Sequence, residues 1–255
     1  MLGTANFRLG KHEEAYNLLQ EAARKLPADA GVQADFAWAA YSMGRVADAR
    51  TVMGKLAPGD SARAADAKDF LALTEPHAVA DAATPALVEK KLAASPTYVP
   101  ALMIRAALQE KAGESPVASY DKVLEVFPQF DPARIALARV YLDDPKQLEA
   151  AEKLANAARE RLKEDPDLSG ILAILNFRKG QFDYAAQLLK ELSAKRALTG
   201  SELFALGMSQ AATKHPAEAR QNLTQALQTK IPEADAAKAK ATLEELTKPV
   251  DEENK

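Results

Sequence analysis

The sequence has no cysteine, three histidines and one tryptophan among its 255 residues. Without cysteine the chain cannot form a disulfide bond, a thiolate zinc site or a cysteine nucleophile. His12, His77 and His215 have no histidine or cysteine partner at helical spacing, so no metal site is expected. His12 and His215 fall at or beside expected turns and are predicted to face solvent, and His77 falls in an expected loop.

Long apolar runs and clusters of one charge are missing as well. The apolar runs are no longer than stretches such as 170–175, whereas a membrane-spanning helix needs about 18 apolar residues. We therefore expect no direct membrane insertion of this segment. The start of the chain, MLGTANFRLGKHEE, lacks the basic and apolar parts of a secretory signal. The 33 basic and 36 acidic side chains are interspersed, which argues against nucleic acid as a partner.

Motifs for catalysis are also lacking. No serine stands in a G-x-S-x-G context, and there is no glycine-rich phosphate loop. Carboxylate pairs such as Asp143-Asp144 are explained as solvated helix ends, because acid–base catalysis needs burial that separates their pKa values. The sequence predicts neither an enzyme nor a bound cofactor.

Alanine, by contrast, is abundant, with 54 residues, and the helix-breaking residues recur at a regular distance. Prolines follow charged, apolar stretches at Pro27, Pro58, Pro96, Pro128, Pro166 and Pro232, which gives about 34 residues per repeat when the last gap, of 66 residues, is counted as two repeats. Gly10 and Gly44 are 34 residues apart, and the pair Leu2-Gly3 recurs 204 residues later as Leu206-Gly207. Because 204 is six times 34, the sequence predicts an internal repeat of about 34 residues.

The chain resembles the tetratricopeptide repeat family in these residues. The unit of that family is two antiparallel helices with Leu-Gly in the first helix, a glycine at the turn, alanines in the second helix and a closing proline. The first unit matches best, with Leu2-Gly3, Gly10, Ala15, Ala22 and Pro27. The seventh unit keeps Leu206-Gly207, Ala219 and Ala226 but has Lys214 at the turn, and the third unit matches poorly.

The resemblance implies an all-α fold, a right-handed superhelix (solenoid) of about seven helical hairpins with a C-terminal capping helix. We expect a single solenoid over residues 1–248, followed by a disordered tail at 249–255. The expected units are 1–29, 30–60, 61–96, 97–128, 129–166, 167–199 and 200–232, with the cap at 233–248. Small residues at fixed positions, such as Gly3 and Gly207, should let the two helices of a unit approach closely.

The helix pattern leads to four further predictions. The third unit should have a long connection near 75–85, and a helix should run over 146–163. The capping helix should place Ala237, Ala241, Leu243 and Leu246 on its inner side. The first helix begins about five residues late within its repeat, so we expect the chain to be a fragment of a larger protein that continues upstream.

In this family the first helix of each unit lines the concave groove that contacts ligands. The corresponding groove residues of this chain are Phe7, Arg8, Trp38, Tyr41, Arg139, Phe177, Arg178 and Met208. Aromatic side chains beside arginine suit a peptide, through stacking and charge-assisted hydrogen bonds to carboxylates. The same aromatic residues can instead pack within the superhelix, and arginines near turns can be simply solvated.

The sequence thus favours a non-catalytic scaffold that binds a protein or peptide partner in the concave groove. The alternative is an architectural or self-associating repeat segment of a larger protein, with weak pairing of two copies through Leu2 and Leu9 of the first repeat. Both the cytoplasm and a bacterial periplasm or cell envelope fit the sequence, and the absence of cysteine leans toward the envelope.

Overall fold

The computed structural model describes residues 1–59 and 61–248, which form fifteen α-helices, two short 3-10 helices and no β-strand. The all-α class predicted from the repeat is confirmed, with helices stacked as hairpins within each unit. The tail over 249–255, where disorder is expected, lies outside the described residues. None of the described helices is both long and apolar enough to cross a membrane.

The chain divides into two compact units, Met1–Ala136 and Leu137–Lys255. The helices of unit 1 are α1 (Leu2–Arg8), α2 (His12–Lys25), α3 (Ala30–Ser42), α4 (Val46–Leu56), α5 (Ala62–Leu73), α6 (Thr84–Ala94), α7 (Val99–Ala112), α8 (Val117–Val126) and the start of α9 (Asp131–Tyr141). The helices of unit 2 are α10 (Leu148–Arg159), α11 (Pro166–Arg178), α12 (Phe182–Ser193), α13 (Gly200–Ala212), α14 (Pro216–Leu227) and α15 (Glu233–Thr247). The single solenoid over 1–248 stays a prediction.

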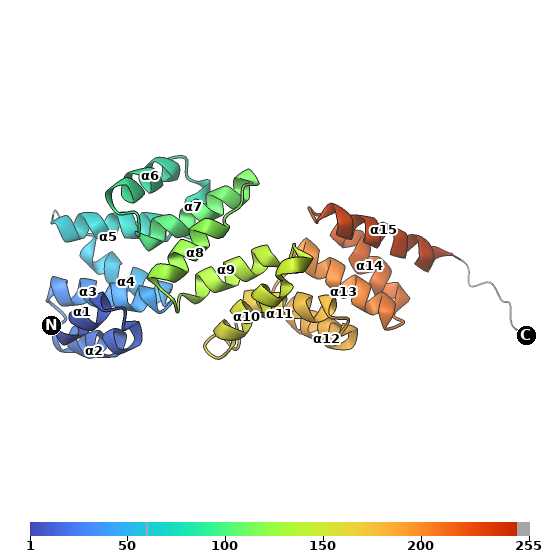
Figure 1. Ribbon diagram of the computed structural model, residues 1–255, viewed down its shortest axis with the longest axis horizontal. Helices are drawn as coiled ribbons and strands as arrows, with labels where there is room; N and C mark the ends of the chain where they lie inside the picture. The colour runs from blue at the N-terminus through green and yellow to red at the C-terminus, as the bar shows by residue number, and fades with distance from the viewer. Residues whose placement is uncertain (60, 249–255) are drawn as a thin grey trace, which may run out of the picture. The chain divides into compact units, whose positions relative to one another are not determined.

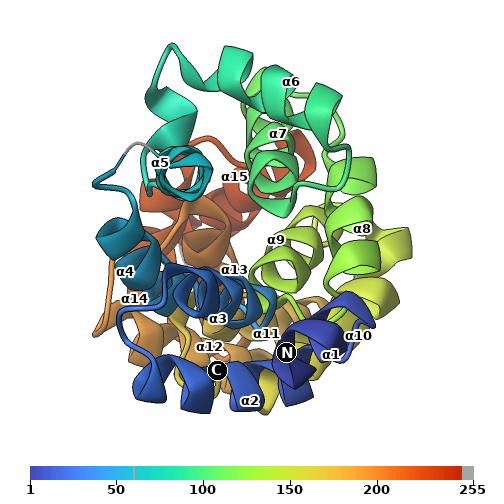
Figure 2. The ribbon, with the colours of Figure 1, turned by 90° about the vertical axis from the view of Figure 1, so that its left-hand side faces the viewer.

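Within each unit, consecutive helices pair as antiparallel hairpins, which Figure 1 shows most clearly for α11–α12 and α13–α14. Second helices also pack against the first helix of the next hairpin, as α2 does against α3 and α12 against α13. Figure 2 shows α1–α2 and α3–α4 of unit 1 as neighbouring hairpins. A single hairpin has an apolar face that it cannot bury alone, so this stacking is what stabilises each unit.

Five of the turns between paired helices share one backbone conformation. Gly10, Gly44, Gly113 and Gly180 all have φ of 75° or 76°, in the left-handed region that glycine adopts without a Cβ penalty. Lys214, which stands at the same turn of the seventh repeat, has φ of 61° and is the one non-glycine residue with positive φ in the described ranges. The repeat therefore imposes the turn geometry even where its glycine is missing.

The third hairpin is irregular, as predicted. Ten residues, 74–83, connect α5 with α6, and they contain a 3-10 turn at Ala78–Ala80. The side chain of Ala78 is buried, and Asp81 Oδ1 accepts a hydrogen bond of 2.9 Å from the Ala83 amide. This connection is folded against its unit rather than being a short glycine turn.

Three sequence expectations are wrong in detail. Helix α10 ends at Arg159 instead of residue 163, since the amides of Arg161 and Leu162 both bond to the Ala158 carbonyl and close the helix with a tight turn. Ala237 and Ala241 are exposed, because α15 turns Asp235, Ala239 and Leu243 toward the core. The third concerns His12, which is buried rather than solvent-facing.

The burial of His12 arises from a contact between distant parts of unit 1. Its ring packs edge-on against Phe7 and Phe127, at 5.2 Å from each centroid. Desolvation lowers the pKa of His12 below its usual 6.5, and a hydrogen bond to the Val126 backbone opposes that shift. Because Phe127 directly follows α8, the first hairpin of unit 1 packs against the end of the fourth.

Candidate partner-binding cleft

Three of the groove residues expected from the sequence meet in unit 2. Phe177 and Arg178, at the end of α11, and Met208, on α13, line one cleft of about 560 Å³. The capping helix α15 forms the opposite wall with Lys238, Thr242, Glu245 and Leu246. We call this site the cap cleft.

The cleft is built on the packed core of unit 2. Asp165 caps α11 by accepting the Leu168 amide at 2.9 Å, and Pro166 takes the first helical position, where no backbone donor is lost. At the far end of α11, Phe177 packs edge-on against buried Phe204 at 5.6 Å between ring centroids. This contact fixes the ring of Phe177, so that part of it faces the cleft and part joins the core.

Arg178 does not face the cleft as a free cation. Its two Nη atoms donate to both carboxylate oxygens of Asp235, at 3.1 and 2.6 Å, and so join α11 to α15. Asp235 is only 3% exposed, and such a fork of two charge-assisted hydrogen bonds is the form in which a buried carboxylate is best stabilised. The expected role of Arg178 as a donor to a partner carboxylate is therefore revised, because its donors already hold the capping helix.

A second carboxylate, that of Asp143, lies near this ion pair. Burial raises the pKa of Asp143, while the charge of Arg178 works in the opposite direction and that of Asp235 raises it further. The Arg139 guanidinium also lowers the pKa of Asp143. Arg139 itself is exposed, at the end of α9, and is not among the residues that line the cap cleft.

The remaining wall of the cleft combines apolar surface with two charged side chains, those of Lys238 and Glu245. Met208 is half-buried, and its Sδ accepts a weak hydrogen bond of 3.4 Å from Thr242 Oγ1. Lys238 is exposed and has no ion pair or hydrogen bond with any other residue in the described part of the chain. The cap cleft therefore offers an aliphatic and aromatic floor with an ammonium group and a carboxylate at its edge.

Three of the four groove residues expected in unit 1 pack into an aromatic cluster. Phe7, Trp38 and Tyr41 belong to an aromatic cluster whose other members are His12, Phe70, Tyr98, Phe127 and Phe130. Tyr41 is 2% exposed, and desolvation raises the pKa of its hydroxyl. Tyr41 therefore packs within unit 1 rather than offering its ring to a ligand, and the expectation that it contacts a partner is revised.

Trp38 and Arg8 have different environments. Trp38 is half-buried, with its ring 5.3 Å from Phe70 and 5.5 Å from Tyr98, both edge-on. Arg8 is exposed at the end of α1. Trp38 thus keeps a partly open face, but an alanine there would remove packing as well as any partner contact.

The wall formed by the capping helix was not among the site residues expected from the sequence. Lys238, Thr242 and Leu246 are spaced by four residues, so they form one stripe along α15. That spacing is visible in the sequence. However, the alanines of the same helix show the same spacing, and alanine is more typical of a packed helix face, so the pattern favours the alanine face as the packed one.

Comparisons with known proteins identify similar chains. Residues 7–74 match a family model described as tetratricopeptide repeat. A tetratricopeptide repeat protein from Parabacteroides merdae is 16% identical, with 96% of each chain covered and a TM-score of 0.47. Human IFIT1, solved as a dimer with m7Gppp-AAAA, is 18% identical over 96% of this chain and 62% of its own, with a TM-score of 0.49. Yeast Tom70 is 13% identical, over 92% of this chain and 58% of its own, with a TM-score of 0.36. No curated protein sequence gives a significant match.

Proposed function

We propose that this chain, in which residues 7–74 match the tetratricopeptide repeat model, is a non-catalytic scaffold that binds a peptide segment of a partner protein in the cap cleft. Repeats of this family commonly mediate protein–protein interaction, and their first helices carry the ligand contacts. In this chain the relevant first helices are α11 and α13, together with the capping helix α15.

The observation that carries the proposal is the convergence of Phe177, Arg178 and Met208 on one cleft. These residues are separated by up to 31 positions in the sequence, and only the stacking of hairpins brings them together. A volume of about 560 Å³ is within the usual range of binding sites, which is roughly 300–1,000 Å³. The cleft is large enough for one or two side chains of a bound peptide.

The chemistry of the cap cleft favours a peptide with an apolar side chain next to an acidic one. A leucine, methionine or aromatic side chain would bury apolar surface against Phe177, Met208 and Leu246. A neighbouring carboxylate would pair with Lys238, which has no partner within the described residues. Arg178 supports this arrangement indirectly, since it holds α15 in place through Asp235.

Site-specific photo-crosslinking tests the proposal. A photoreactive amino acid is placed at Lys238 and, as a matched control, at Lys240, which is equally exposed but points about 200° away around the same helix. Crosslinked proteins from the native source are identified by mass spectrometry, and the affinity of the purified partner is then measured. We expect capture from position 238 but not from 240. We also expect Lys238→Glu to weaken binding about tenfold or more, while Lys240→Glu leaves it unchanged.

Equal capture from both positions, or an affinity insensitive to Lys238→Glu, would reject the cap cleft as the binding site. Trp38→Ala is a less suitable variant, because Trp38 also packs against Phe70 and Tyr98. RNA is not proposed as a partner, since basic and acidic side chains are balanced at 33 and 36.

The second candidate is self-association through the first repeat, and exposed apolar side chains at its outer face favour it. Leu2 is 67% exposed and Leu9 is 72% exposed, both in or beside α1. Pairing of two copies there would remove this apolar surface from water. Sedimentation at rising concentration should reveal a weak dimer that Leu2→Lys with Leu9→Lys abolishes. A monomer at every concentration would reject this candidate and leave the cap cleft untouched.

A further inference from the structure

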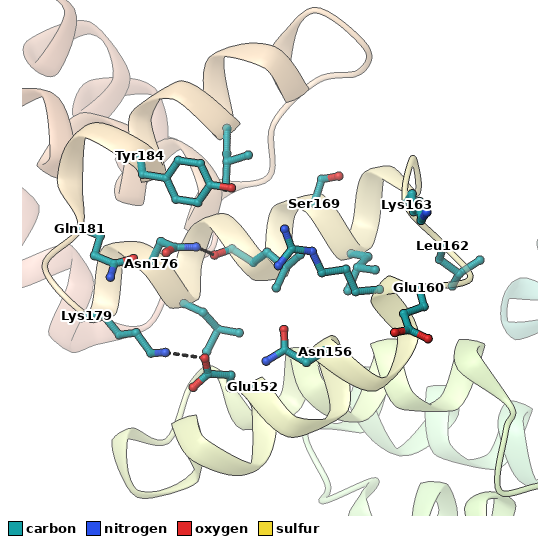
Figure 3. A pocket seen from close by; sticks show the side chains of 15 residues that line it. Glu152, Asn156, Glu160, Leu162, Lys163, Ser169, Asn176, Lys179, Gln181 and Tyr184 are labelled. Atoms are coloured by element: carbon teal, nitrogen blue, oxygen red, sulfur yellow. Dashed lines mark hydrogen bonds and ion pairs between the residues drawn. The ribbon is translucent and has the colours of Figure 1, made fainter.

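A second cleft, of about 680 Å³, lies between α10 and α12, with α11 as its floor (Figure 3). We call it the outer cleft. On one side the lining residues are Glu152, Asn156 and Arg159 of α10, followed by Glu160 and Lys163 just after the end of the helix. From the other side, α12 and the turn before it contribute Gln181, Tyr184 and Leu188.

The outer cleft is separate from the cap cleft. Both clefts are lined by residues of α11, but Asn176 faces the outer cleft and Arg178 the cap cleft. Two residues along an α-helix are rotated by about 200° from each other, so the two clefts open on opposite faces of α11. A ligand in one cleft therefore leaves the other accessible.

The floor of the outer cleft is aliphatic. Leu172 and Leu188 are only partly buried, and Leu175 lies beneath them with 3% of its surface exposed. Between hairpins of this fold the second helices normally cover such side chains. Here α10 and α12 stand apart over α11, and the leucines remain accessible from outside.

The two ends of the outer cleft differ in charge. At one end Lys179 Nζ and Glu152 Oε1 are 2.5 Å apart and neutralise each other, as the dashed line in Figure 3 shows. At the other end Arg159 and Lys163 have no ion pair with any residue in the described ranges, and Glu160 is the one acidic residue of the cleft lining there. The lining of this end therefore has two cationic side chains and one acidic one, and an acidic group would complement it.

Side-chain amides stand on both rims. Asn156 on α10 and Gln181 before α12 make no side-chain hydrogen bond within the described residues, and each offers both a donor and an acceptor. An extended peptide has backbone N–H and C=O groups that need such partners, whereas a hydrocarbon chain has none. The amides therefore favour a peptide over a lipid as the occupant.

We propose that the outer cleft docks an extended peptide segment of a partner protein, with aliphatic side chains on Leu172 and Leu188 and an acidic side chain paired with Arg159 and Lys163. The peptide lies between α10 and α12, and its backbone bonds to Asn156 and Gln181. The protein thus has two peptide-binding faces on α11 and can hold two segments at once.

A random dodecapeptide library displayed on phage provides the probe. The full chain is used for selection, and the enriched peptides are synthesised and titrated by fluorescence anisotropy. We expect one class with aliphatic and acidic residues, whose affinity falls about tenfold or more in the Arg159→Glu, Lys163→Glu double variant. Ser169→Tyr, which fills the cleft from α11 without removing a packed leucine, should weaken the same class.

Matched controls separate this site from general charge effects and from the cap cleft. The double variant Lys195→Glu, Lys240→Glu changes the net charge equally at exposed positions outside both clefts, and it should bind the peptides normally. Lys238→Glu should also leave them unaffected. If no selected peptide responds to the Arg159, Lys163 variant, the proposal is overturned. Binding of pyrene-labelled hexadecanoate that this variant abolishes, without any responding peptide, overturns it in favour of a lipid.

Discussion

Gly207 of α13 lies directly against Leu223 of α14, so closely that a Cβ on Gly207 would stand 2.7 Å from Leu223 Cγ. Gly3 and Leu19 of the first hairpin have the same relationship, again at 2.7 Å. The two glycines are 204 residues apart, which is the repeat distance taken six times. The Leu-Gly pair of the repeat is thus explained by helix contact, because a larger residue would force the hairpin open.

Gly207→Ala should therefore destabilise unit 2. The new methyl group would also meet the Leu223 backbone nitrogen at 3.0 Å, so a change of the Leu223 rotamer alone cannot relieve the contact. We expect the free energy of unfolding to fall by about 1–3 kcal/mol, as for other overpacked sites. Hydrogen exchange of the α13 and α14 amides measures this loss locally.

Gly54→Ala is the matched control for this substitution. Gly54 is exposed within α4 and has no atom within 4 Å of an added Cβ. Alanine there should raise stability by about 0.5–1 kcal/mol through its better helix propensity. If both alanine variants changed stability alike, close packing at Gly207 would not be the reason for its glycine.

The turn at Lys214 offers a stabilising substitution. Lys214 holds φ of 61°, which costs a residue with a Cβ about 1–2 kcal/mol relative to glycine. Its side chain is exposed and makes no ion pair within the described residues, so little is lost with it. We expect Lys214→Gly to slow hydrogen exchange in α13 and α14. Gly180→Ala, at the open turn of the preceding hairpin, should accelerate hydrogen exchange in α11 and α12. Faster exchange in Lys214→Gly would contradict the strain argument.

Unit 1 should lose stability as the pH falls. Burial depresses the pKa of His12 in the folded chain below 6.5, so the unfolded chain binds more protons between that lowered pKa and 6.5. The contribution of neutral His12 is complete above about pH 6.5 and is lost as the pH falls toward the folded pKa, at most about 1.4 kcal/mol per pH unit. Urea unfolding followed by Trp38 fluorescence reports unit 1 specifically, since Trp38 is the one tryptophan of the chain.

His12→Phe tests the origin of that pH dependence. Phenylalanine retains an aromatic ring between Phe7 and Phe127 but cannot be protonated. The variant should show a flatter stability profile between about pH 7 and about pH 5 than the native chain. His77→Phe, at an exposed position of the third hairpin, should leave the native profile unchanged. An unchanged slope in His12→Phe would assign the effect to other groups.

Most of the fold could be predicted because its signals are local. Turn glycines such as Gly10, prolines at first helical positions such as Pro216, and the Thr199–Glu202 capping box each specify a boundary within a few residues. Near Arg159 no such residue marks the boundary, and the helix is closed instead by backbone hydrogen bonds to the Ala158 carbonyl. The sequence pattern alone therefore extended α10 too far.

The site was less predictable, because it depends on contacts between distant hairpins. The repeat pattern predicts that Tyr41 lies on the groove side of α3, but Phe127 and Phe130 pack against its ring and bury it. Likewise the sequence shows Arg178 as a free cation, although Asp235 lies 57 residues later. The position of a residue within its repeat indicates which face of the helix it lies on. It does not indicate which residue of another repeat packs against its side chain.

The pair Arg178–Asp235 should control the attachment of the capping helix. Arg178→Ala leaves the Asp235 carboxylate, with 4% of its side chain exposed, without its partner, which costs about 3 kcal/mol in a buried pair. Arg178→Lys retains the charge but not the fork of two hydrogen bonds, so we expect an intermediate loss. Hydrogen exchange of the amides over Glu233–Thr247 measures both effects.

Arg220→Ala is the control for this last prediction. Arg220 also reaches the capping helix, through one hydrogen bond of 2.9 Å from Nη1 to the Leu246 carbonyl, but at an exposed position. Its loss should change exchange in α15 by the equivalent of about 1 kcal/mol or less, because solvent can replace the bond. The expected order of protection is therefore native and Arg220→Ala, then Arg178→Lys, then Arg178→Ala. If Arg178→Ala and Arg220→Ala released α15 equally, the capping helix would be held by its apolar contacts to Phe204 and Leu223, and the ion pair would contribute nothing beyond a surface interaction.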